Sequence, residues 1–152
     1  MRLLPCLLAL LSASPLAAES ITLGDLVIDT PHAYATPAMA RTGAAYLTIT
    51  NTGATDERLL SVTGGLPRIE IHTVEMTDGM ATMRRLDEGV PIPAGETVSL
   101  APGGEHIMLI GLPSPLIAGE TLDLGLVFDR AGELALSFDI IERPEGDAAH
   151  GH

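Results

Sequence analysis

The chain consists of short runs that are either apolar or alternate between apolar and polar residues. Clusters of Gly, Pro, Asn and Asp separate these runs. No segment keeps a helical period, and the breakers recur roughly every eight to twelve residues. Strands are expected at Ile21–Ile28, Ala44–Thr50, Arg58–Val62, Ile69–Val74, Met80–Leu86, Thr97–Leu100, Glu105–Ile110, Thr121–Phe128 and Glu133–Ile141. Regularly spaced short strands of this kind are typical of an all-β sandwich or barrel. Pro31–Pro37, which holds His32, is expected to be a loop, and Asn51-Thr52-Gly53 is expected to be a turn.

The strongest short turn signal is Asp78-Gly79, between two of the predicted strands. A hairpin that turns there places His72 opposite Arg85 and Val74 opposite Met83. His72 and Met83 then share one face as diagonal neighbours, about 7 Å apart and within reach of long side chains.

Two further methionines of this hairpin complicate the assignment of a metal ligand. Met76 shares the face of Met83 and could replace it as the thioether ligand, whereas Met80 points to the other face. A longer loop would change this register, so the sequence permits the geometry without fixing it.

The first 18 residues have the layout of a secretory signal. Met1-Arg2 gives a positive start, an apolar run follows, and small residues precede the expected cleavage. The run is too short for a membrane span, and it contains the lone cysteine, Cys6. We therefore predict a signal peptide over 1–18, a β-sandwich domain over 19–142 and a flexible tail over 143–152. The mature protein is expected to be cysteine-free, periplasmic and not inserted in the membrane.

The composition is strongly acidic, with a formal net charge of −12 and no lysine. Removal of Arg2 with the signal changes this charge to −13. Such a chain repels phosphate backbones and anionic lipid, which argues against nucleic-acid and membrane-surface partners. It would attract cations or a basic partner. The alternative is that the negative charge only keeps the protein soluble.

Histidine and methionine carry the candidate chemistry. His106 and Met108 lie two apart in a predicted strand, so both point the same way, about 6.7 Å apart along it. With His72 and Met83 they offer two imidazoles and two thioethers for one ion. Thioether sulfur is soft and suits copper(I), whereas zinc prefers thiolate, imidazole and carboxylate, and calcium needs oxygen ligands. A blue-copper centre needs a cysteine thiolate, which the mature chain lacks.

Spacing alone leaves other interpretations open. Methionine is a common core filler, and a histidine on a strand is usually a satisfied polar residue. A metal-free β-sandwich interaction module with methionines in its core is therefore the main alternative, and a copper-dependent redox enzyme is another. The sequence shows no paired carboxylates and no nucleophile elbow around its serines, so we predict that the protein is not an enzyme.

The order His72-x10-Met83-x22-His106-x-Met108 resembles the motif of the periplasmic copper(I) chaperone family known as PCuAC. The resemblance covers nearly all of residues 21–141. It is carried also by Thr42–Gly53, Ile69–His72, Ile92–Gly95, Ala101–Leu112 and Leu116–Thr121.

The resemblance implies a cupredoxin-like Greek-key β-sandwich that binds copper(I) through His72, Met83, His106 and Met108. It implies delivery of copper to a cytochrome oxidase site, with an oxidase subunit or assembly factor as the acceptor; we expect a monomer. Two departures stand out.

His32 occupies a position where the family often carries tryptophan, and it is a candidate extra ligand or merely exposed. Met80-Ala81-Thr82-Met83 replaces the usual valine-methionine pair and spacer, which keeps Met80 as a competitor of Met83. His150 and His152 either capture copper(II) or have no role.

Overall fold

The computed structural model describes residues 19–146, so the predicted signal peptide and the His150–His152 end of the tail lie outside it. Within this range the chain forms eleven β-strands and no helix. They are β1 Ile21–Leu23, β2 Leu26–Tyr34, β3 Thr42–Asn51, β4 Glu57–Gly64, β5 Arg68–Thr77, β6 Met80–Arg85, β7 Val90–Ile92, β8 Thr97–Leu100, β9 His106–Ile110, β10 Thr121–Phe128 and β11 Gly132–Ile141. No helix in this part of the chain is long and apolar enough to cross a membrane.

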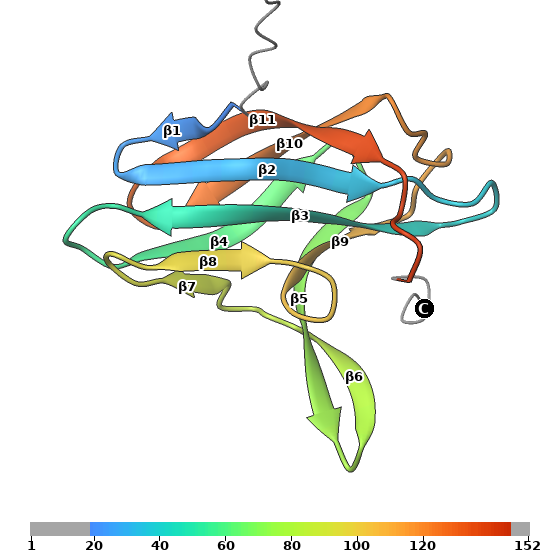
Figure 1. The fold of residues 1–152 in the computed structure, drawn as a ribbon, viewed down its shortest axis with the longest axis horizontal. Coiled ribbons are helices and arrows are strands. Elements are labelled where there is room, and N and C mark those ends of the chain that lie inside the picture. The colour runs from blue at the N-terminus through green and yellow to red at the C-terminus, as the bar shows by residue number, and fades with distance from the viewer. Residues whose placement is uncertain (1–18, 147–152) are drawn as a thin grey trace, which may run out of the picture.

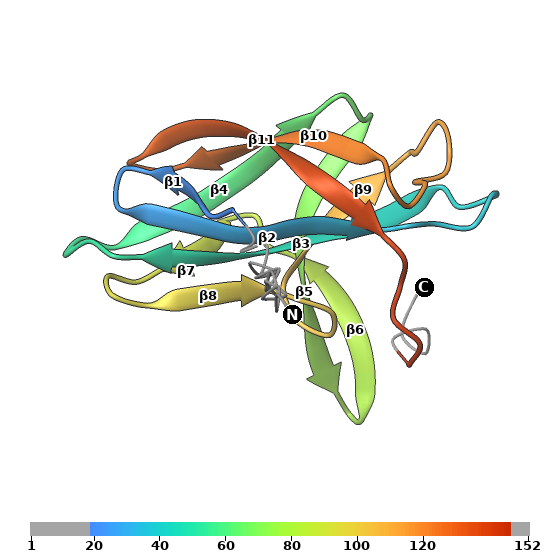
Figure 2. The same cartoon turned by 45° about the horizontal axis from the view of Figure 1, so that its top comes forward.

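The strands follow the order β6-β5-β9-β3-β2-β11-β10-β4-β7, with β1 added to β2 and β8 added to β3. All neighbours run antiparallel except β11 and β2, which are parallel. The path curls back until β4 contacts β5. Two layers result, with β2, β3 and β8 in one and β4 and β10 in the other (Figures 1 and 2). This is the β-sandwich that the strand spacing predicts.

Alternating apolar side chains from both layers fill one core. The largest fully buried ones come from most strands of the path: Phe138, Ile28, Leu47, Ile49, Leu59, Ile92, Leu100, Ile107, Leu109, Leu112 and Leu126. At about 25 cal/mol per Å² of apolar surface, each such side chain contributes roughly 1.5–3 kcal/mol to stability. β5 and β9 share this pattern, since Ile71, Ile107 and Leu109 point inward and their neighbours in sequence point outward.

The N-terminal region differs from the predicted single strand Ile21–Ile28. Gly24, with a φ of +58°, turns the chain between β1 and β2, so that Leu23 pairs with Leu26. The predicted loop over Pro31–Pro37 was also wrong in its first half. β2 continues to Tyr34 through a bulge at Thr30, whose φ of +49° lets the strand resume pairing at His32.

The predicted turn at Asn51-Thr52-Gly53 is confirmed, and its physical basis is the buried Asn51 side chain. Its amide nitrogen donates to the carbonyl oxygens of Thr55 at 2.8 Å and Ile92 at 3.0 Å. Its amide oxygen accepts the Gly53 N–H at 3.0 Å. One side chain thus ties the end of β3 to β7.

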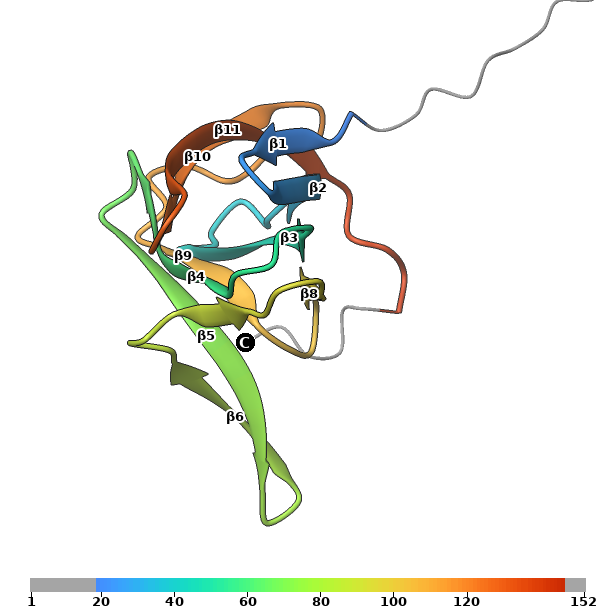
Figure 3. The same cartoon turned by 90° about the vertical axis from the view of Figure 1, so that its left-hand side faces the viewer.

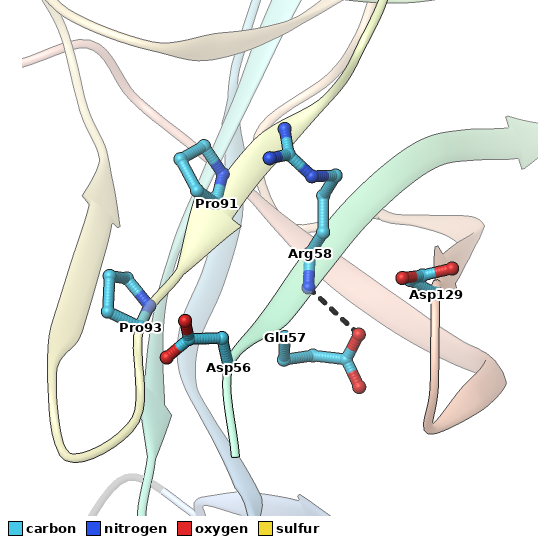
Figure 4. A pocket seen from close by; sticks show the side chains of 6 residues that line it. All are labelled: Asp56, Glu57, Arg58, Pro91, Pro93 and Asp129. Atoms are coloured by element: carbon cyan, nitrogen blue, oxygen red, sulfur yellow. Dashed lines mark hydrogen bonds between the residues drawn. The ribbon is translucent and has the colours of Figure 1, made fainter.

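Glu57 forms a second tie at the start of β4. One carboxylate oxygen accepts the backbone N–H groups of Arg58 at 2.8 Å and Arg130 at 3.0 Å, and the other accepts that of Ala131 at 2.9 Å. Figure 4 shows this carboxylate in the cleft that Asp56 and Asp129 also line. The buried Glu57 therefore clamps the turn between β10 and β11 onto β4.

β5 and β6 form an arm that projects from the body of the sandwich (Figures 1 and 3). The predicted register is confirmed: His72 pairs with Arg85 and Val74 with Met83. The turn residues Asp78 and Gly79 both have positive φ, +52° and +80°, as a type I′ hairpin turn requires. Every residue of β6 is exposed, so the arm is held to the body through β5 alone.

The last described residues run beyond β11. Arg143 places its guanidinium 5.5 Å from the centre of the Tyr34 ring, within the range of a cation–π contact. The beginning of the predicted tail therefore contacts the sandwich.

Candidate metal centre

The four predicted ligands share one face of three adjacent strands. β5 lies between β6 and β9, and His72 on β5 stands directly opposite His106 on β9. Glu70 pairs with Met108, and Val74 with Met83, so both methionines occupy positions diagonal to His72. Diagonal neighbours have Cα atoms about 7–8 Å apart, which long side chains span. The face points away from the core that Ile71 and Ile107 fill.

The two histidine rings lie close together, with centroids 5.9 Å apart and planes inclined by 59°. His106 is 5% exposed, and its Nδ1 donates to the carbonyl oxygen of Gly104 at 2.9 Å. That bond leaves Nε2 of His106 with the lone pair. Bonds from imidazole nitrogen to a metal are about 2 Å long, so one ion fits between two rings at this separation.

His72 presents a nitrogen atom without any partner. Its Nε2 donates to the carboxylate of Glu70 at 2.7 Å, and its side chain is 15% exposed. Nδ1 of His72 is buried and is the only such side-chain nitrogen or oxygen in residues 19–146 that lacks a hydrogen bond. A buried polar atom left unpaired costs free energy, which a bound cation would remove. Its lone pair and that of His106 thus suit a shared ion.

Glu70 anchors this arrangement. Its carboxylate also pairs with Arg68 at 3.1 Å and Arg85 at 3.2 Å. The hydrogen bond from His72 lowers the pKa of Glu70; burial opposes this, and the charges of Arg68 and Arg85 add to it. Glu70 is therefore a carboxylate at neutral pH, and it fixes both the orientation of the His72 ring and the nitrogen that carries the proton.

The two methionines differ in accessibility. Met108 is partly buried on β9, whereas Met83 is 43% exposed at the base of the arm. Met83 is therefore not a core residue, contrary to the interpretation in which the methionines only fill the interior. Together the four side chains offer two nitrogen and two sulfur donors, all of them neutral. Solvent reaches this set of donors from the side of Met83. Such a set suits a soft cation of low charge.

Other candidates from the sequence lie elsewhere. His32 donates from Nδ1 to the Thr30 carbonyl oxygen at 2.8 Å and packs against Tyr34 and Tyr46, with ring centroids 5.6 and 5.5 Å away. Met80 pairs with Thr77, so it faces the opposite side of the arm from Met83. In the described part of the chain, no three His, Cys, Asp or Glu side chains cluster as a metal site.

The two arginines beside Met83 pair with local carboxylates. Arg84 binds Glu75 at 2.7 Å, and Arg85 binds both Glu70 and Asp87, the latter at 2.8 Å. The hydrogen bond from Arg84 lowers the pKa of Glu75. Both arginines are therefore engaged by nearby carboxylates.

Glu70 is the functional residue that sequence reasoning missed. The signal that would have found it is the Glu-x-His spacing, which puts both side chains on one face of a strand. A carboxylate next to a ligating histidine is a recurrent feature of metal sites.

Comparison with solved structures defines the class of fold. The structure superposes on the apo PCuAC domain from PmoF1 with a TM-score of 0.70 and 25% identity, covering 82% of this chain and all of that domain. The CuI form of DR1885 from Deinococcus radiodurans gives a TM-score of 0.63 and 27% identity, with 86% of both chains covered. The fold is thus the cupredoxin-like β-sandwich of PCuAC domains.

The sequence itself places the chain within a family. Residues 26–140 match the family described as "Putative lipoprotein LpqE-like", and the chain belongs to that family. "Putative lipoprotein Lxx21020" of Leifsonia xyli subsp. xyli is 38% identical over 86 residues, which are 56% of this chain. The match spans about half of that relative, 52% of its length.

Proposed function

We propose that this protein is a periplasmic copper(I) chaperone that holds one ion through His72, Met83, His106 and Met108. The observation that carries the proposal is the buried, unpartnered Nδ1 of His72, in a ring whose centroid lies 5.9 Å from that of His106. The soft donor set supports copper(I) over harder cations. The structural relatives support it too, since one of them is the CuI form of DR1885.

The carrier holds its cargo without altering it. Neutral nitrogen and sulfur ligands leave copper(I) its single charge, and oxidation to copper(II) would favour harder, tetragonal ligation. Solvent reaches the site from the side of Met83, so ligands can be exchanged one at a time with an acceptor. We propose, from the family resemblance, that the acceptor is a cytochrome oxidase subunit or assembly factor, and that residues 1–18 are removed on export.

X-ray absorption on the copper(I)-loaded protein tests the ligand set directly. We expect one copper per chain, with two sulfur and two nitrogen neighbours. A shell of oxygen atoms, or purified protein that takes up no copper(I), would contradict the proposal and favour the metal-free interaction module.

Removing the Glu70 carboxylate should weaken copper(I) binding without removing a ligand. In the Glu70→Ala protein the His72 ring loses the acceptor that orients it, so the affinity should fall about 10–100-fold. Glu70→Gln keeps an oxygen acceptor and should recover part of the loss. The measurement is competition with a copper(I) chelator.

The matched control is Glu75→Ala. Glu75 also lies on β5 and pairs with an arginine, but it faces the other side of the arm. Its removal should leave the affinity unchanged. Equal affinities in the Glu70→Ala and Glu75→Ala proteins would show that Glu70 does not position His72.

A further inference from the structure

The arm exposes methionines to an unusual degree. Met76 is 69% exposed and Met80 70% exposed, one on each side of the turn at Asp78-Gly79. Methionine is normally among the more buried side chains. Neither residue fills the core or covers a neighbouring strand, because the outer part of the arm stands clear of the sandwich (Figure 3). Packing therefore does not account for a thioether at these positions.

The register assigns the two methionines to opposite faces. Met76 pairs with Ala81, so it shares the face of Val74, Met83 and His72. Met76 and Met83 are diagonal neighbours in this ladder, as Met83 and His72 are. Met80 lies instead on the face of Thr82 and Arg84, where the Glu75–Arg84 ion pair stands.

The sulfur and nitrogen donors on the face shared by Met76, Met83 and His72 form a series of decreasing exposure. Met76 is 69% exposed, Met83 43% and the side chain of His72 15%, and His106 at the inner end is 5% exposed. The residues that fill the gaps between the two methionines are Val74 and Ala81, both apolar. No carboxylate on this face lies between Met76 and His72 in the register. A copper(I) ion that moved along the series would keep neutral soft ligands throughout.

We propose that Met76 is the outer ligand through which copper(I) enters and leaves the site. This rests on the proposed function. Met76 and Met83 hold the ion briefly while it passes between the arm and the histidine pair. An acceptor that presents a thiolate or thioether to the tip of the arm can then replace Met76 before the inner ligands release the ion. Met76 thereby sets the rate of transfer and contributes little to the affinity at equilibrium.

The test compares Met76→Leu with Met80→Leu in the full-length protein. The two residues are about equally exposed and lie on either side of the same turn. The Met80→Leu control therefore removes one thioether sulfur too, but from the other face of the arm. The probe is bathocuproine disulfonate, a copper(I) chelator, with release from the loaded protein followed by stopped-flow absorbance. Met76→Leu should slow chelator-driven release about tenfold, which corresponds to about 1.4 kcal/mol in the barrier. Its affinity should stay within about twofold of the unchanged protein, and Met80→Leu should alter neither quantity.

Three results would overturn the proposal. Equal release rates for the two variants would show that the Met76 sulfur plays no part. A tenfold loss of affinity in Met76→Leu would make it a ligand of the resting site. Release rates that do not depend on chelator concentration would show that copper leaves by simple dissociation. An unchanged protein that binds no copper(I) would instead refute the proposed function, so the two failures are distinguishable.

Discussion

The His72→Ala protein is expected to remain folded and to lose more than about 100-fold in copper(I) affinity. Loss of an outer hydrogen bond to a ligand already costs about 10–100-fold, and this change removes the ligand itself. His72 is the one position that neighbours His106 directly and both methionines diagonally. Removal of the His72 imidazole leaves three donors, without the central one that neighbours each of the others.

The fold should tolerate this change. The His72 side chain lies on the outer face and makes one side-chain hydrogen bond, so its removal should cost about 1 kcal/mol of unfolding free energy. Glu70 would still pair with Arg68 and Arg85.

His32→Ala provides the control, because His32 is also a strand histidine with one hydrogen bond to a carbonyl oxygen. Chelator competition and a thermal melt on both proteins separate loss of binding from loss of fold. Comparable affinities in the two variants would reject His72 as a ligand.

The Glu57→Ala protein is expected to lose about 2–4 kcal/mol of unfolding free energy. The carboxylate satisfies three backbone N–H groups, and alanine would leave all three without their acceptor. For a domain of this size the midpoint of thermal unfolding should fall by roughly 10 °C. Glu57→Gln should be intermediate, because one of its two terminal atoms is a donor facing a donor.

Asp56→Ala is the matched control for Glu57. Asp56 is adjacent to Glu57, and its carboxylate accepts a single backbone hydrogen bond, from the N–H of Ala94 at 3.0 Å. Its substitution by alanine removes the same charge as Glu57→Ala. Its loss should cost less than about 1 kcal/mol. Calorimetry on the three variants measures the difference, and equal midpoints for Glu57→Ala and Asp56→Ala would contradict the clamp. Copper(I) affinity should not change in any of them, since none of these residues lies on β5, β6 or β9.

Local sequence signals predicted much of this fold correctly. The Asp78-Gly79 signal gave the register of the arm, and with it the shared face of His72 and Met83. Asn51-Thr52-Gly53 gave the corner between β3 and β4. Both succeed because the chemistry of a short turn is contained in the two or three residues that form it.

The errors arose where distant parts of the chain decide the outcome. Pro31 suggested a loop, yet β3 and β11 on either side hold the strand through His32. The break at Gly24 is the exception, because Gly24-Asp25 between two apolar runs is itself a local signal for a two-residue hairpin turn.

The pairing of β5 with β9 is likewise a property of the whole sheet. His72 and His106 are 34 positions apart in the sequence, and their spacing alone does not reveal that they stand opposite one another. The exposure of Met76 and Met80 also depends on how far the arm stands from the body. Neither feature could be derived from a local pattern.

The tight reversal at the tip of the arm has a consequence for how such proteins can diverge. Side chains along a strand alternate with a period of two, so the parity of the connecting loop decides which set of β6 side chains meets the histidines. One inserted residue that shifts the pairing by one position would bring Thr82 opposite Val74 in place of Met83. A hydroxyl would then stand where the sulfur is now. Lineages that keep the soft-metal chemistry should therefore vary this connection by even numbers of residues.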